Sequence, residues 1–164
     1  MKRSSSLFCT TVFLISMPFY AGCSKYENTL APDFALRVMG GGGDEWYDKV
    51  ISLGNLRGQP VVIHFTASWC YMCKHIFDTI KNHDSSAFVM GIGVLDRKDK
   101  FRAYLLAERF SVPVGFDEDG IIAKEYHVNT LPMTIFIDRN GIIRERLIGM
   151  VSGERLNDAM KKIL

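Results

Sequence analysis

Two cysteines three residues apart, directly after an apolar run, constrain the fold of this chain more than any other feature. Residues 60–66 (Pro-Val-Val-Ile-His-Phe-Thr) are typical of a buried strand, and Cys70 and Cys73 follow it. A helix that begins at about Cys70 holds both sulfur atoms near its N-terminus, where unpaired backbone N–H groups and the helix dipole favour a thiolate. Because the thiolate is the nucleophile in disulfide exchange, the pattern predicts a redox pair in which Cys70 is the more exposed thiol.

A Cys-x-x-Cys pattern also occurs in zinc sites, haem-attachment sites and structural disulfides, and the sequence supports these less well. No second Cys-x-x-Cys or His-x-x-x-His segment follows to complete a zinc site, and Lys74 stands where c-type haem attachment needs histidine. We therefore expect no metal and no cofactor. A structural disulfide is disfavoured because pairs at a helix start are exposed and reducible. A copper-binding module or metallochaperone stays open, because soft Cu(I) ligands gather within six residues: Cys70, Met72, Cys73 and His75.

Residues 1–23 have the pattern of a secretory leader. A short basic start precedes an apolar stretch at residues 7–19, which is too short for a comfortable membrane span. Residues 20–23 (Tyr-Ala-Gly-Cys) resemble a bacterial lipobox, in which cleavage leaves a lipidated Cys23, although its tyrosine stands where leucine is usual. Ordinary cleavage just before that cysteine and an uncleaved membrane anchor are the alternatives.

Such a leader implies an extracytoplasmic, oxidising location on the periplasmic side, tethered to the membrane. The 20 Lys and Arg exceed the 18 Asp and Glu by the two bases of the leader, Lys2 and Arg3. The remainder is therefore neutral on balance, which argues against nucleic acid as a partner. We expect a tether over residues 24–30 and a single domain over residues 31–164. Because Cys70 and Cys73 are the one cysteine pair in that domain, they favour an exported catalyst over a disulfide-stapled scaffold.

Along the domain, the hydrophobic pattern predicts alternating strands and helices. Strands are expected at residues 33–38, 46–51, 61–66, 87–95, 112–116, 133–138 and 142–148. Helices are expected from about Cys70, over residues 99–110 and 121–126, and after the N-cap residue Ser152. The glycine run at residues 40–43 and the Asn-Gly pair at residues 140–141 predict two turns between antiparallel strands. The chain is expected to fold as an α/β domain.

Four motifs together resemble the thioredoxin superfamily, and more narrowly its exported, membrane-tethered thiol–disulfide oxidoreductases of the TlpA/ResA-like branch. They are Ala-Pro-Asp-Phe at 31–34, Leu-Arg-Gly-Gln-Pro at 56–60, Trp-Cys-x-x-Cys at 69–73 and Thr-Leu-Pro at 130–132. The resemblance implies a thioredoxin fold, with a central mixed sheet flanked by helices, an N-terminal hairpin and an inserted strand-helix unit at about 87–110. A thiol peroxidase shares this fold, but its Pro-x-x-x-Thr-x-x-Cys pattern is absent, because Thr66 lies four residues before Cys70.

The resemblance also implies roles for the site residues. Cys70 would attack the substrate, and Cys73 would release the mixed disulfide. Pro132 resembles the family's cis-proline, which faces the cysteine pair and leaves the Leu131 backbone free to bind a substrate peptide; bonds before proline are where a cis peptide costs least. Trp69 resembles the aromatic residue beside the family's active site, a role compatible with ordinary half-buried packing.

Two departures from thioredoxin itself bear on mechanism. His64 stands six residues before Cys70, where thioredoxin has a buried carboxylate. It is either a proton relay for the resolving thiol or a neutral, hydrogen-bonded core residue, and we favour the second because burial lowers the pKa of an imidazole. Tyr71-Met72 replaces the usual Gly-Pro between the cysteines, so the reduction potential stays open.

The substrates and partners follow from the resemblance alone. It favours a reductant of protein thiols, in the maturation of cytochrome c or of a metal centre, supplied by an upstream redox partner. An oxidant and an isomerase are the alternatives.

Overall fold

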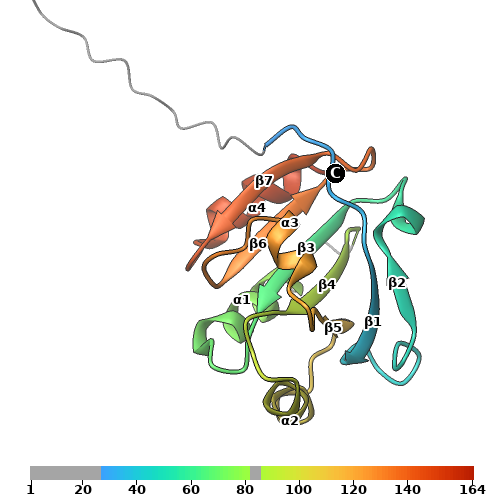
Figure 1. Ribbon diagram of the computed structural model, residues 1–164. Helices are drawn as coiled ribbons and strands as arrows, with labels where there is room; N and C mark the ends of the chain where they lie inside the picture. The colour runs from blue at the N-terminus through green and yellow to red at the C-terminus, as the bar shows by residue number, and fades with distance from the viewer. Residues whose placement is uncertain (1–26, 82–85) are drawn as a thin grey trace, which may run out of the picture.

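The computed structural model describes residues 27–81 and 86–164, whose strands form one seven-stranded mixed sheet in the order β2-β1-β5-β4-β3-β6-β7 (Figure 1). The strands are β1 (Ala35–Gly40), β2 (Val50–Ser52), β3 (Val61–Thr66), β4 (Phe88–Gly93), β5 (Val114–Phe116), β6 (Met133–Ile137) and β7 (Ile143–Ile148). The helices are α1 (Tyr71–Lys81), α2 (Lys98–Glu108), α3 (Ile121–Glu125) and α4 (Gly153–Lys161), with a 3₁₀ turn η1 (Leu53–Leu56). The expected thioredoxin-like α/β fold is confirmed.

Strand β3 is the centre of this sheet. All six of its residues are buried, and it pairs in parallel with β4 and antiparallel with β6. A strand that is covered on both faces has to be apolar almost throughout, which explains the run Val-Val-Ile-His-Phe-Thr. At one edge β1 and β2 form the expected antiparallel N-terminal hairpin, and at the other β6 and β7 form a second hairpin. Gly141 in the second hairpin's turn has a φ of +77°, which favours glycine.

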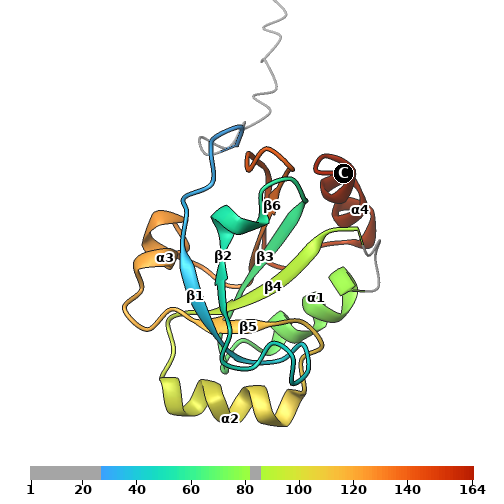
Figure 2. The ribbon, with the colours of Figure 1, turned by 90° about the vertical axis from the view of Figure 1, so that its right-hand side faces the viewer.

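The helices cover both faces of the sheet (Figure 2). On one face, α1 and α4 pack over Val62, Phe136 and Leu147, and α2 packs against Phe77 of α1 and Val114 of β5. On the other face, α3 and the N-terminal hairpin pack over the alternate side chains of β3, β4 and β6. Packing on the first face buries the apolar stripe of α1, which consists of Cys73, Ile76, Phe77 and Ile80.

Two glycines in β4 allow the helices to lie close to the sheet. A Cβ atom on Gly91 would come within 2.5 Å of the Phe77 ring, and one on Gly93 within 2.3 Å of the Phe101 ring. Any larger residue at these positions would displace α1 or α2 from the sheet. The strand and helix expected at about 87–110 are β4 and α2. The Phe101 ring of α2 packs directly on Gly93 of β4.

Two expected elements differ in extent from those observed. The strand expected at 46–51 is β2, which begins only at Val50. Trp46 and Tyr47 lie in turns instead, because their N–H groups donate to the carbonyls of Gly43 and Asp44. Asp48 has a φ of +62°, which ends any strand there. The helix expected at 99–110 ends at Glu108, because Arg109 adopts the left-handed conformation. The other elements lie close to their predicted bounds, and Ser152 caps α4 by accepting a hydrogen bond from the Arg155 N–H.

The chain enters the domain beside the start of β7. Leu30 forms an isolated bridge with Ile142, and the Asn28 N–H donates to the Ile143 carbonyl at 2.7 Å. The leader expected at 1–23, with Cys23, lies outside the described residues, as does the first part of the tether expected at 24–30. Within the part of the chain that is described, no helix has the length and apolar character that a membrane crossing requires.

Candidate active site

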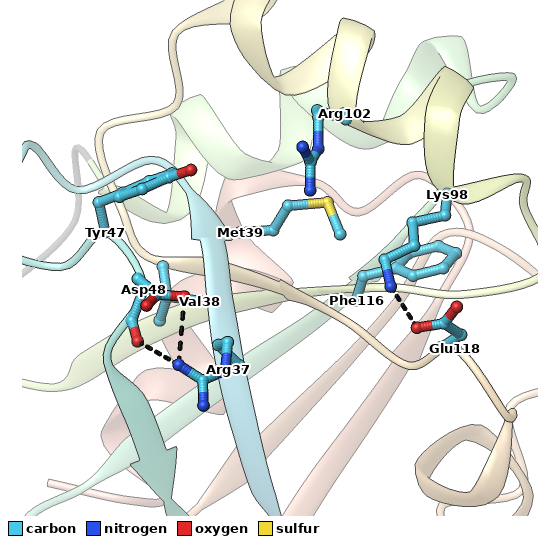
Figure 3. A pocket seen from close by; sticks show the side chains of 9 residues that line it. All are labelled: Arg37, Val38, Met39, Tyr47, Asp48, Lys98, Arg102, Phe116 and Glu118. Carbon is cyan, nitrogen blue, oxygen red and sulfur yellow. Dashed lines mark hydrogen bonds and ion pairs between the residues drawn. The ribbon is translucent and has the colours of Figure 1, made fainter.

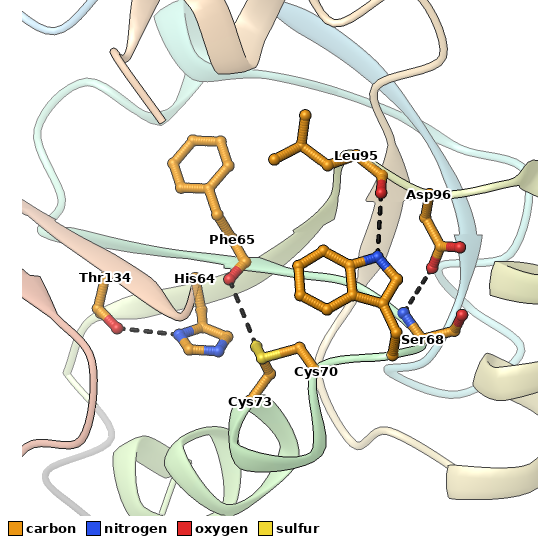
Figure 4. The surroundings of a disulfide bond; sticks show 9 residues. His64, Phe65, Ser68, Cys70, Cys73, Leu95, Asp96 and Thr134 are labelled. Carbon is orange, nitrogen blue, oxygen red and sulfur yellow. Dashed lines mark hydrogen bonds between the residues drawn. A yellow bond between two sulfur atoms is a disulfide. The ribbon is translucent and has the colours of Figure 1, made fainter. Parts of the chain in front are cut away.

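Cys70 and Cys73 form a disulfide at the junction of β3 and α1 (Figure 4). After the last residue of β3, the chain turns so that the Cys70 N–H donates to the Ala67 carbonyl at 3.0 Å and the Cys73 N–H donates to the Cys70 carbonyl at 3.1 Å. Helix α1 starts at Tyr71, so Cys70 immediately precedes the helix and Cys73 lies in its first turn. The helix N-terminus therefore favours the anionic form of a thiol at this place.

The two cysteines differ in access to solvent. Cys70 is 8% exposed and Cys73 is 0% exposed, so the order of exposure predicted from the sequence is confirmed, although both belong to the buried class. The sulfur of Cys73 lies 3.9 Å from the Phe65 carbonyl oxygen at the end of β3. An incoming sulfur atom can therefore approach Cys70 more easily than Cys73.

The loop before the disulfide is attached to the loop that follows β4. The Trp69 indole N–H donates to the Leu95 carbonyl at 3.0 Å, and the Ser68 N–H donates to the Asp96 carboxylate. Trp69 nevertheless remains 61% exposed, so the expected aromatic surface beside the pair is present. Neither Leu95 nor Asp96 was expected from the sequence to lie at the site. Their signal was the position of Asp96 just after a buried strand parallel to β3, since parallel strands end at the same edge of a sheet.

Leu131 and Pro132 approach the disulfide from the start of β6. The Leu131–Pro132 peptide bond is cis, as the resemblance implied. Partly buried Leu131 packs against the cluster that Ala67 forms with the two cysteines. Among the hydrogen bonds of the described residues, none involves the Leu131 backbone, whereas the Pro132 carbonyl accepts from the Gly149 N–H at 2.9 Å.

His64 lies beneath the pair, within the sheet. It is 0% exposed; its Nδ1 lies 2.9 Å from the Thr134 hydroxyl, and its ring packs against Phe77 at a centroid distance of 4.4 Å. Burial lowers the pKa of His64 from 6.5 to about 3, and the backbone of Cys73 opposes this shift only in part. The imidazole is therefore neutral at physiological pH, which agrees with a hydrogen-bonded core residue.

Two hollows lie on either side of Trp69. One, of about 620 Å³, is lined by Ser68, Trp69, Tyr71, Met72, Lys74, His75, Asp78, Tyr104, Glu108 and Met150. The other, of about 560 Å³, runs along the loops after β4 and β5. Apolar side chains are exposed around the first hollow, with Tyr71 at 93% and Met150 at 53%. Exposed apolar side chains thus lie beside a nearly buried disulfide.

A separate pocket of about 330 Å³ lies between β1 and α2 (Figure 3). Its charges are largely paired, since Arg37 contacts Asp48 at 3.1 Å and Lys98 contacts Glu118. None of its lining residues belongs to the segment that carries the disulfide, so it has no part in the chemistry of the pair.

The copper alternative gains no support from the described residues. There, no group of three or more His, Cys, Asp or Glu side chains is placed to hold a metal ion. Met72 and His75 line the hollow beside Trp69, and the two cysteine sulfurs are bonded to each other.

Fold and site together define a thioredoxin-like thiol–disulfide oxidoreductase. Residues 28–146 match the AhpC/TSA family, and the chain belongs to that family. It is 25% identical to the thiol-disulfide oxidoreductase ResA of Bacillus subtilis over 163 residues, covering 96% of this chain and 87% of that relative. It is 27% identical to the sporulation thiol-disulfide oxidoreductase A of the same species over 166 residues, covering 96% of both.

Solved structures agree on the fold. A putative thiol:disulfide interchange protein DsbE from Chlorobium tepidum has a TM-score of 0.70 and 24% identity, covering 82% of this chain and 95% of that structure. StoA from Bacillus subtilis has a TM-score of 0.63 and 23% identity, covering 80% of this chain and 98% of that structure. The enzyme class and the family branch expected from the sequence are thereby confirmed.

The lowered pKa of His64 predicts a pH-dependent stability. Below pH 6.5 the unfolded chain binds a proton on this imidazole and the folded chain does not. Stability is therefore fully present above pH 6.5 and declines as the pH falls towards 3, by about 1.4 kcal/mol per pH unit. His64→Asn loses the packing of the imidazole ring against Phe77, so its free energy of unfolding in urea should be lower than that of wild type at neutral pH. Because it also removes the titration, that free energy should fall less steeply in acid. His75→Asn, at an exposed position of α1, should keep the wild-type slope; equal slopes in all three proteins would contradict the assignment.

Proposed function

We propose that this protein exchanges disulfides with cysteines of other proteins, with Cys70 as the attacking thiolate and Cys73 as the resolving thiol. The observation that carries the proposal is the unequal access of two bonded sulfurs at one helix N-terminus, 8% for Cys70 against 0% for Cys73. Helix N–H groups stabilise the Cys70 thiolate, and the thiolate performs the attack. Cys73 is then the nearest thiol to the mixed disulfide that forms.

The substrate would bind across Trp69 and Leu131. The Leu131 backbone, for which the described residues provide no hydrogen bond, is available to an extended peptide, and its side chain packs against the cysteine pair. Pairing of a substrate backbone at a strand end supplies affinity without sequence preference. Exposed Trp69, Tyr71 and Met150 supply apolar contact area around it.

The division of labour predicts different trapping by the two serine variants. Cys73→Ser should accumulate mixed disulfides between Cys70 and substrate proteins, because the thiol that releases them is missing. Cys70→Ser should trap few, because Cys73 is fully buried. Non-reducing gels of extracts quenched with acid, with Cys9 and Cys23 replaced by serine in every variant, measure the trapped species. Equal trapping by both variants would refute the assignment of roles.

We infer further that the protein works as a reductant. The named relatives include thiol-disulfide oxidoreductases and thiol:disulfide interchange proteins, names that leave the direction of electron flow open. The physical support comes from Lys74, the first cation of α1, which is engaged with Glu108 at 2.8 Å. Strong oxidants of this fold owe their potential to a heavily stabilised reduced form, and a paired cation adds little to that stabilisation. Thiols that must be kept reduced during cytochrome c or metal-centre maturation are the proposed substrates, served by an upstream electron donor.

The reduction potential of the Cys70–Cys73 couple tests this direction. Equilibration with glutathione or dithiothreitol buffers should give a value near about −270 mV, the range of a thioredoxin-like reductant. Glu108→Gln frees Lys74 to stabilise the Cys70 thiolate, so it should raise the potential slightly, and the shift should be small because exposed ion pairs are weak. A wild-type value near about −120 mV would make the protein an oxidant and overturn the inference.

We also propose that the domain is extracytoplasmic and tethered through Cys23. The leader pattern at residues 1–23 and the lipobox-like end at Cys23 support this location. More than one acyl chain would hold the protein firmly, at about 0.8 kcal/mol for each buried CH₂ group.

Lipidation predicts that the mature protein fractionates with membranes and incorporates labelled fatty acid. Cys23→Ser should abolish the label and leave the disulfide exchange of Cys70 and Cys73 unchanged, because the tether and the site are separate parts of the chain. Cys9→Ser, within the same leader, serves as the control and should keep the label. Wild-type protein that is unlabelled and free of membranes would show that the tyrosine of the lipobox prevents lipidation.

A further inference from the structure

Three buried polar atoms on β3 and α2 have no partner in hydrogen-bonding geometry among the described residues. They are Nε2 of His64, the hydroxyl oxygen of Thr66 and the hydroxyl oxygen of Tyr104. Buried polar groups are nearly always hydrogen-bonded, to protein or to ordered water. Three such atoms in one region of the core therefore point to ordered water that completes their hydrogen bonds.

The sheet register brings these atoms to one place. His64 and Thr66 are two residues apart on β3, so both side chains point to the face that α1 and α2 cover. In the neighbouring strand β4, Gly91 is opposite His64 and Gly93 is opposite Thr66. The ring of Phe77 lies on Gly91, and the ring of Phe101 lies on Gly93.

Tyr104 follows Phe101 by one turn of α2, which directs its hydroxyl towards Thr66. The Thr66 hydroxyl is near enough to oppose part of the rise that burial causes in the pKa of Tyr104. Cys73 is adjacent, since its sulfur lies 3.9 Å from the carbonyl that joins Phe65 to Thr66, and its backbone acts on His64. Cys73 is thus flanked by both polar residues of β3.

Tyr104 also reaches the outside of the molecule. It lines the hollow of about 620 Å³ beside Trp69, together with Lys74, Asp78 and Glu108. Its hydroxyl is buried, whereas part of its ring faces that hollow. Among the described residues, Tyr104 is the side chain that belongs both to the polar site under Cys73 and to an open surface.

We propose that the hydroxyl groups of Tyr104 and Thr66, joined by ordered water, form the path by which Cys73 loses and regains its proton during disulfide exchange. The inference rests on the proposed function and assigns to it residues that its two thiols do not include. His64 would hold the water through Nε2 and is a positioning residue in this scheme.

In the reducing direction, Cys73 resolves the mixed disulfide between Cys70 and the substrate. Cys73 Sγ–H gives its proton to the path, and the resulting thiolate attacks Cys70 Sγ. The bond between Cys70 and the substrate sulfur breaks as the Cys70–Cys73 bond forms. The substrate sulfur leaves as a thiolate and takes a proton from solvent, so two electrons pass from the dithiol to the substrate disulfide. The oxidising direction is the reverse of these steps.

The groups along the path stay neutral, so they can pass a proton on without becoming charged for long. Burial keeps the pKa of His64 at about 3, so the imidazole stays neutral. Burial, with Glu108 and Asp78, raises the pKa of Tyr104, so the phenol also stays neutral and passes a proton by accepting one and donating another. The titratable groups at the outer end are Glu108 from α2 and Lys74, His75 and Asp78 from α1.

The reaction of the reduced protein with dithiobis(nitrobenzoate) tests the path, with Cys9 and Cys23 replaced by serine throughout. The first nitrothiolate released reports attack by Cys70, and the second reports attack by Cys73 on the mixed disulfide. Tyr104→Phe and Thr66→Val each remove a hydroxyl and keep the shape of the side chain. Tyr47→Phe, at an exposed position away from the disulfide, is the control.

In Tyr104→Phe we expect the second phase to slow about 10- to 100-fold near neutral pH, with the first phase unchanged. The defect should disappear at about pH 10, above the ordinary thiol pKa, because hydroxide then removes the proton directly. Thr66→Val should behave alike, and Tyr47→Phe should match wild type in both phases.

A second phase in Tyr104→Phe that keeps the wild-type rate at every pH overturns the path. A rate lowered equally at all pH values also overturns it, because that result indicates displaced packing. If both phases are normal in wild type but no protein disulfide is reduced, the proposed function fails and the path stands.

Discussion

The pairing of β3 is the constraint on which the rest of the site depends. Because β3 runs parallel to β4 and antiparallel to β6, its C-terminal end lies beside the end of β4 and the beginning of β6. That single arrangement brings the loop at Leu95 and the cis peptide at Pro132 to the cysteines, from segments far apart in the chain. Complete burial of β3 prevents a shift of register, since a slip by one residue would exchange its two covered faces.

The electrostatic environment differs between the outer end of β3, where Cys70 follows it, and the buried face of β3, which carries His64. Outside, the helix N-terminus favours an anionic sulfur at Cys70, while Lys74 is paired with Glu108 and adds little to this effect. Inside, the environment is dry enough to keep His64 and Tyr104 neutral. Disulfide exchange needs both conditions at once, because one thiol has to ionise readily while the other has to stay protonated until its turn. A carboxylate at position 64 would supply a charge of its own, whereas this chain has an imidazole that carries none.

Short motifs and hydrophobic periodicity in the sequence predicted the fold class and the position of the cysteine pair. The alternation of apolar residues predicted an α/β domain, and four motifs together carried the resemblance to the thioredoxin superfamily. The placement of Cys70 and Cys73 at a helix start predicted the order of exposure of the thiols. The strand expected at 46–51 was too long, because the conformation of Asp48 depends on hydrogen bonds to β1 that periodicity does not reveal. Asp96 and Tyr104 were missed for a related reason: each acquires its role from a neighbour more than 25 residues away in sequence, Ser68 in one case and Thr66 in the other.

The point where the chain enters the domain determines which way the disulfide faces. Leu30 and Asn28 are attached beside Ile143, which pairs with Ile137, and Ile137 pairs with Val61 at the beginning of β3. The cysteines follow the opposite end of that strand, about 20 Å away at the usual rise per residue. Any attachment through the N-terminal segment therefore holds the domain by the end remote from its sulfurs. If that attachment were to a membrane, the disulfide would face away from the membrane and towards partners in the aqueous phase.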